Sequence, residues 1–127
     1  MLDRSRWRTP PQIDDFIADE LAGARKANVP WPHLERAHIV SQPWAGAHAR
    51  VHAVMLATAL RQRDPRETIG QLVRLVVAAP GSLTGRYPTG NTGRSSMALT
   101  RTAPVPDELD DLLEHATAAA PAPVDDE

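Results

Sequence analysis

Apolar side chains recur every three or four residues along most of the chain, which is the spacing that places them on one face of an α-helix. We therefore predict five helices, over about residues 12–27, 31–42, 46–63, 65–79 and 106–118. Asp64 can cap the fourth helix and Pro65 suits its first turn, whereas Pro80 and Gly81 are expected to end it. The predicted fold is all-α, with two antiparallel helical hairpins that form either a four-helix bundle or a tetratricopeptide-like pair.

The same periodicity predicts which side of each helix faces the core. In the first helix the inward residues are expected to be Ile13, Phe16, Ile17, Leu21 and Ala24. In the third they are expected to be His48, Val51, His52, Met55, Leu56, Ala59 and Leu60. In the fourth they are expected to be Ile69, Leu72, Val73, Val76 and Val77. The short last helix is expected to turn its leucines inward.

The chain has 127 residues, a length that suggests one domain. Residues 1–11 carry three arginines and are predicted to form a flexible basic arm. Residues 12–118 form the predicted helical domain, in which a glycine-rich strap covers residues 81–105. Residues 119–127 are rich in alanine, proline and acidic residues, a composition typical of a disordered tail.

Composition narrows the classes of function. There is no cysteine, so disulfides and thiolate metal sites are excluded. The net charge is −2, which gives no general electrostatic reason to expect nucleic-acid binding. The longest apolar run, residues 72–80, contains Arg74 and is too short to span a bilayer. We expect a cytoplasmic protein without a membrane anchor.

The chemistry-bearing residues concentrate on two adjacent predicted helices. Glu35 and His38 are spaced i, i+3 on the second helix, and His48 and His52 are spaced i, i+4 on the third. Both spacings place side chains on one helical face. Because the connection between these helices is short, the two sets are expected to meet.

Imidazole and carboxylate donors together match the ligand set of an open transition-metal site. The sequence therefore predicts a divalent metal bound by Glu35, His38, His48 and His52, with zinc, nickel, cobalt, copper or iron all compatible with these donors. Polar residues on the facing helices could hydrogen-bond to the ligands, and the candidates are Gln42, Glu67, Gln71 and Arg74.

Two other interpretations of the histidines remain open. Buried histidines often only hydrogen-bond to neighbouring carboxylates or carbonyls, and would then be structural. Glu35-x-x-His38 also matches one element of a di-iron helical bundle. A homodimer would be needed to supply two such elements, with Glu20 or Glu67 as further carboxylates.

The strap contains a glycine-rich run from Gly85 to Arg94 without a clear period. Gly90, Asn91 and Gly93 favour left-handed turn geometry. The alternative is an anion-binding nest of backbone amides, with Arg86, Asn91 and Arg94 as possible anion or strap contacts.

Several motifs together resemble an uncharacterised bacterial family of unknown function whose members are often encoded near heavy-metal resistance and efflux functions. The shared residues include Leu34–Ile39, Gln42, His48, Val51, His52, Met55, Leu56, Gly70, Gln71, Arg74, Gly81–Leu83, Gly85, Arg86, Pro88, Gly90–Gly93 and Pro104–Pro106. The resemblance covers about residues 13–113. It implies metal handling by association and assigns no residue a role.

The sequence is therefore compatible with three functions. The first is binding of a divalent metal for storage, buffering or delivery in metal homeostasis. The second, from a different class, is a helical-repeat-like adaptor that binds a protein partner and in which the histidines are structural. The third is a metal-dependent enzyme in which the strap acts as a lid. The partners that the sequence allows are a second copy of the chain or another protein, and neither nucleic acid nor a membrane is expected.

Overall fold

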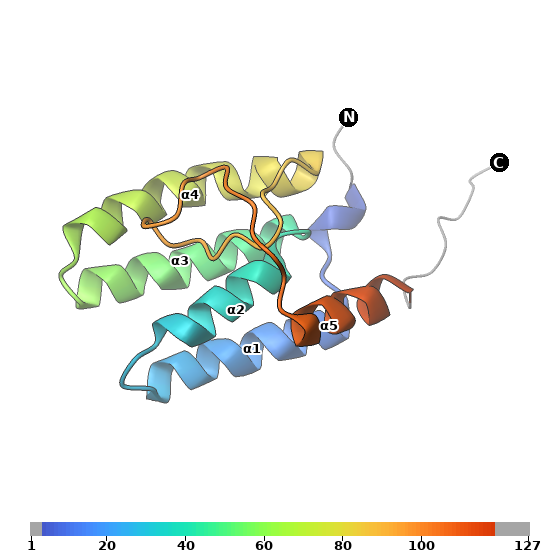
Figure 1. Ribbon diagram of the computed structural model, residues 1–127, viewed down its shortest axis with the longest axis horizontal. Helices are drawn as coiled ribbons and strands as arrows, with labels where there is room; N and C mark the ends of the chain where they lie inside the picture. Colours follow the sequence, from blue (N-terminus) through green and yellow to red (C-terminus); the bar gives the residue numbers. More distant parts are fainter. Residues whose placement is uncertain (1–3, 119–127) are drawn as a thin grey trace.

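The first four α-helices pack in series, each against the next, and the fifth packs back against the first two (Figure 1). The structure is a computed structural model that describes residues 4–118. Within this range it contains five α-helices, one short 3-10 helix and no strand. The elements are η1 (Arg4–Trp7), α1 (Pro11–Lys26), α2 (Trp31–Ser41), α3 (Ala45–Arg61), α4 (Pro65–Thr84) and α5 (Asp107–Ala118). The all-α prediction is confirmed.

The core lies mainly where α1, α2 and α3 meet. α1 packs on α2, α2 on α3 and α3 on α4, while α5 covers α1 and α2. The buried apolar side chains include Ile13, Ile17, Leu21, Leu34, Val40, Val51, Met55 and Leu109. Part of the predicted basic arm forms η1, which contacts α3 and α4. Residues 1–3 of the arm and the predicted tail at 119–127 lie outside the described residues.

The start of α4 has the predicted cap. The Asp64 side chain accepts a hydrogen bond from the backbone N–H of Glu67 at 3.0 Å. This bond satisfies one of the free N–H groups at the helix start, and Pro65 needs no partner there because it has no N–H. Local sequence therefore determines where α4 begins.

The predicted end of α4 is wrong. The helix continues through Pro80 to Thr84 and stops at Gly85, whose φ of 70° is left-handed. The Arg86 N–H donates to the Gly81 carbonyl at 2.8 Å and the Gly85 N–H donates to the Ser82 carbonyl at 3.2 Å. These two bonds form a Schellman motif, which satisfies the last carbonyls of the helix. The added turn brings Ser82 to the interior.

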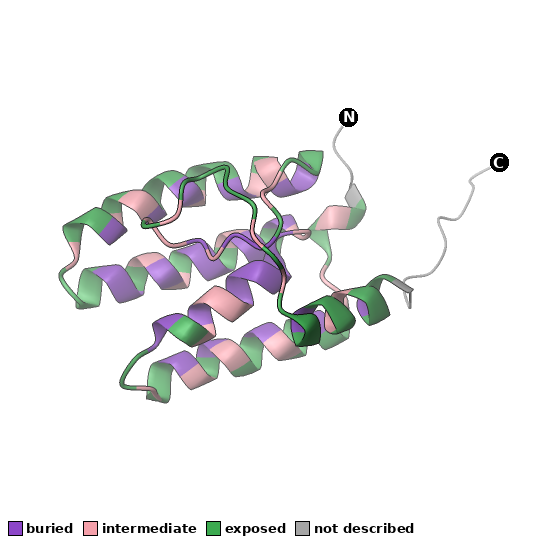
Figure 2. Cartoon of the chain, viewed as in Figure 1, coloured by how far each residue is buried: buried purple, intermediate pink, exposed green. Residues whose placement is uncertain are grey.

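The predicted inward face of α4 is also wrong. Its buried residues are mainly polar: Glu67, Gln71, Arg74, Ala78, Ser82 and Leu83. The residues predicted to be inward are exposed instead, namely Ile69, Leu72, Val73, Val76 and Val77. Leu60, at the end of α3, is exposed as well. Figure 2 shows that exposed positions recur along α4. The helix is amphipathic as expected but inverted, because its polar side finds hydrogen-bond partners inside the molecule.

The connection between α4 and α5, residues 85–106, crosses the helices as an ordered loop (Figure 1). Gly90 and Gly93 have φ of 78° and 82°, as predicted, whereas Asn91, for which left-handed geometry was also predicted, does not have a positive φ. The Asn91 amide donates to the carbonyls of Ala98 and Arg101, which ties two parts of the connection together. Within the described residues, no helix combines the length and apolarity that a membrane span requires.

Candidate metal centre

Three histidines meet at the interior junction of α2, α3 and α4. His38 lies near the end of α2, and His48 and His52 lie one turn apart on α3. We call these three residues the His triad. Their Nε2 atoms form a triangle with sides of 3.0 Å (His38–His52), 3.1 Å (His38–His48) and 3.2 Å (His48–His52). All three side chains are buried.

The Nδ1 atom of His38 must carry a hydrogen. It lies 2.6 Å from the backbone carbonyl oxygen of Asn91, which can only accept a hydrogen bond. In a neutral imidazole only one nitrogen is protonated. The Nε2 atom of His38 therefore presents a lone pair to the centre of the triad.

The tautomer of His52 follows from the amide of Gln71. The His52 Nδ1 atom lies 2.7 Å from Gln71 Oε1. The orientation of this amide is determined, because Gln71 Nε2 donates to Glu67 Oε1 at 2.9 Å and to the Gly93 carbonyl at 2.7 Å. Reversing the amide would place its oxygen against two acceptors. His52 Nδ1 thus donates, and its Nε2 atom also presents a lone pair.

The tautomer of His48 follows from the hydroxyl of Ser82. Ser82 Oγ donates its hydrogen to the backbone carbonyl of Gln42 at 2.5 Å. It therefore accepts from His48 Nδ1, which lies 2.8 Å away. As in the other two rings, the unprotonated nitrogen is Nε2.

Three lone pairs therefore converge with no hydrogen between them. Burial lowers the pKa of His38 well below its ordinary value, and the nearby His52 and His48 lower it further. Burial, followed by the effect of His52, lowers the pKa of His48 to about 3. Burial also lowers the pKa of His52 to about 4, although the hydrogen bond to Gln71 opposes it. All three rings are neutral at pH 7, so the Nε2 atoms repel one another unless a cation lies between them.

The triangle has dimensions that suit a transition-metal ion. Imidazole nitrogens bind zinc at about 2.0–2.1 Å, and tetrahedral geometry then separates them by about 3.3 Å. The observed separations of 3.0–3.2 Å are close to this value. Each Nδ1–H is held by a hydrogen-bond acceptor, as is usual for metal-ligating histidines. In the described residues, the His triad is the one group of three or more potential ligands close enough to hold an ion.

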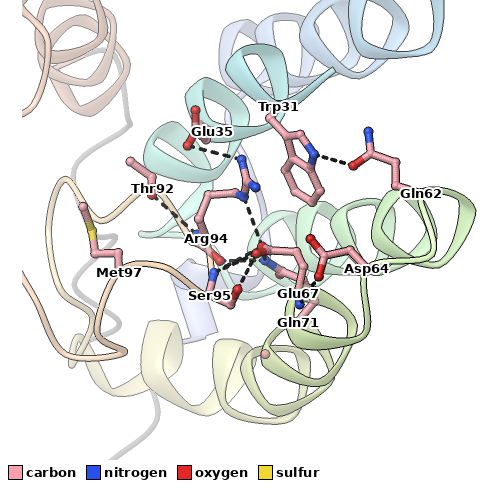
Figure 3. Close-up of polar contacts among 12 residues, drawn as sticks. Trp31, Glu35, Gln62, Asp64, Glu67, Gln71, Thr92, Arg94, Ser95 and Met97 are labelled. Carbon is pink, nitrogen blue, oxygen red and sulfur yellow. Dashed lines mark hydrogen bonds and ion pairs between the residues drawn. The ribbon is translucent and has the colours of Figure 1, made fainter. Parts of the chain in front are cut away.

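Glu67 lies at the centre of a group of polar contacts that includes Gln71 (Figure 3). Its carboxylate accepts from Gln71, from the Arg94 Nε–H at 3.2 Å and from both the backbone and the hydroxyl of Ser95. Burial raises the pKa of Glu67, but the hydrogen bonds from Ser95 and Gln71 outweigh burial, so the pKa is lowered overall. The charged carboxylate thereby links the connection to the amide that orients His52.

Glu35 was expected among the ligands, but the structure does not bring it to the triad. Its carboxylate points toward Arg94, with 4.0 Å between Glu35 Oε1 and Arg94 Nη1. The Arg94 guanidinium also lies over the Trp31 ring, 3.9 Å from its centroid. Spacing places Glu35 one turn before His38 on α2, but the arginine provided by the connection draws the carboxylate away.

The residues that were predicted to hydrogen-bond to the ligands differ in what they contact. Gln71 bonds directly to His52, whereas Gln42 contributes its backbone carbonyl to Ser82 and its side chain to the Pro88 carbonyl. The Arg74 guanidinium donates to the backbone carbonyls of Gly70 and Met97. Arg86, a predicted anion contact, is exposed.

Ser82 was missed as a partner of His48, as was the backbone role of Asn91. A signal for Ser82 exists in the sequence. Glu67, Gln71, Arg74 and Ser82 recur at helical spacing, as a polar stripe of α4. The position of the Asn91 carbonyl has no comparable signal, because it depends on how the connection folds.

Comparison with known proteins identifies the family to which the chain belongs. No curated protein and no solved structure matches the chain. A family model with the description "Protein of unknown function (DUF3703)" matches residues 13–113, a range that includes the His triad and every residue that bonds to it. The chain therefore belongs to this family of proteins of unknown function.

Proposed function

We propose that the protein binds one divalent transition-metal ion through the Nε2 atoms of His38, His48 and His52. The proposal rests on the convergence of three buried Nε2 lone pairs. The tautomer of each histidine ring is determined by a separate hydrogen-bond acceptor at its Nδ1 atom. A purely structural network would place a hydrogen in each short polar contact. Here the three contacts inside the triad have none.

The donor set favours ions of intermediate softness. Three neutral imidazoles suit zinc, cobalt, nickel, copper(II) or ferrous iron, and offer nothing specific to calcium or magnesium. A single preorganised site in a small chain is suited to storage, buffering or delivery of such an ion in metal homeostasis. Glu35 is assigned no ligand role in this proposal.

The test is metal content after purification without an affinity tag and incubation with each ion in turn. We expect about one ion per chain in the unaltered protein. Each of three variants should lose the ion: His38→Gln, His48→Gln and His52→Gln. Two imidazole ligands remain in each variant, and no other side chain nearby supplies the third. Glu35→Gln should retain it.

His115→Gln is the matched control, because His115 is an exposed histidine on α5 whose Nδ1 atom contacts a backbone carbonyl. It should bind the ion like the unaltered protein. If no ion binds to the unaltered chain and the triad variants lose only stability, the histidines are structural and the proposal is wrong.

A further inference from the structure

A cavity opens on the His triad. It has a volume of about 380 Å³ and is lined by all three histidines. This volume lies in the range of small-molecule sites. Within the described residues no fourth ligand joins the three histidines, so an ion held by their Nε2 atoms would keep open coordination positions. The cavity is the space that all three histidines line, and we take it to be where those positions are reached.

The cavity has a positive electrostatic character. Its charged side chains are Arg74, which is buried, and Arg86, which is exposed. No aspartate or glutamate of residues 4–118 lines it. The guanidinium of Arg74 is bonded to two neutral carbonyls, and Glu67 lies near enough to raise the pKa that burial lowers. A divalent ion on the triad would add further positive charge, so the cavity favours an anion.

Most of the remaining wall is apolar. It is formed by Val77, Pro80, Tyr87, Pro88 and Leu99. Such a wall stabilises a hydrocarbon group by removing it from water. The positively charged side chains and the apolar wall together are complementary to a molecule that has one anionic end and one apolar end.

We propose that the metal-loaded protein binds a small organic carboxylate, whose oxygen atoms contact the ion and whose hydrocarbon part lies on the apolar wall. This inference rests on the proposed metal site. It extends that site from an ion-binding centre to one that recognises an external ligand of defined chemistry.

The experiment uses the cobalt-loaded protein, because the visible spectrum of cobalt reports changes in its ligands. Metal content is measured on the same sample, followed by titration with acetate, butyrate and hexanoate, and with 1-hexanol as the uncharged control. We expect each carboxylate to change the spectrum and the affinity to rise about three- to fourfold for each added methylene group. Hexanol should leave the spectrum unchanged.

Two variants test the wall and the charge separately. Leu99→Ser should reduce the gain in affinity with chain length, and Arg86→Gln should weaken all three carboxylates. Arg50→Gln is the matched control, because Arg50 is an exposed arginine that does not line this cavity. A cobalt-loaded protein whose spectrum ignores carboxylates would overturn this inference and leave the metal site intact. A protein that binds no metal would overturn both.

Discussion

His38 Nδ1 donates to the backbone carbonyl of Asn91, which lies 53 residues later in the chain and 2.6 Å away. A residue of the connection therefore determines the orientation of a triad ring that α2 supplies. Gly93, two residues beyond Asn91, leaves no room for a side chain beside this ring. The connection is thus part of the candidate site as well as its cover.

Gly93→Ala is expected to reduce metal affinity. A Cβ atom at this position would lie 2.7 Å from His38 Cδ2, so the ring would have to move. The φ of 82° adds backbone strain of about 1–2 kcal/mol for any residue with a side chain. Metal affinity, measured by competition with a chelator, should fall together with the free energy of unfolding.

Gly85→Ala separates these two effects. Gly85 also has a positive φ, of 70°, but a Cβ atom there would meet nothing closer than the Arg6 side chain at 3.5 Å. The variant should lose only the stability that the backbone strain costs and should keep its metal affinity. Equal losses of affinity in both variants would show that the ring contact does not matter.

Gln71→Leu is expected to weaken metal binding by about 10- to 100-fold, because His52 loses the acceptor that orients it. The change also leaves the Glu67 carboxylate and the Gly93 carbonyl without their amide donor, at a cost of about 1–3 kcal/mol. Chelator competition and urea unfolding measure the two effects. Gln12→Leu, on the exposed side of α1, is the control, and the role assigned to Gln71 is wrong if the two variants bind equally well.

The metal-free protein should lose stability as the pH falls below about 6.5. The pKa values of His48 and His52 are lowered on folding, to about 3 and about 4, and that of His38 is lowered as well. The unfolded chain, with ordinary histidine pKa values near 6.5, therefore binds more protons in this interval, and the free energy of unfolding rises with pH. Urea unfolding between pH 5 and pH 8 measures the effect. A flat profile between pH 5 and pH 6.5 would mean that the triad is not buried in its neutral form.

Removing the metal should destabilise the protein. An ion that binds only the folded state at 100 times its dissociation constant adds about 2.7 kcal/mol to the free energy of unfolding. For a chain of this size, the melting temperature should rise by roughly 10 °C with metal and fall again with a chelator. His48→Gln should show no such shift. A melting temperature that responds equally in this variant would place the bound ion elsewhere.

Residues close in sequence were sufficient to predict where helices begin and which histidines share a face. The Asp64 cap needs only the Glu67 N–H three residues later, and the one-turn spacing of His48 and His52 is a property of α3 alone. The end of α4 was harder, because Pro80 suggests a stop and the actual stop depends on the left-handed Gly85.

Sequence periodicity identified an amphipathic α4 but not which face is buried. Ile69 and Val76 form the apolar side that usually faces a core, yet they are exposed because Gln71 and Ser82 bond to the histidines of α3. Glu35 has the spacing of a ligand but turns to Arg94. Spacing and caps are local properties, so they can be recognised from neighbouring residues. The direction of a side chain depends on partners that only folding brings near, and here the tertiary structure determined both the inverted helix and the composition of the His triad.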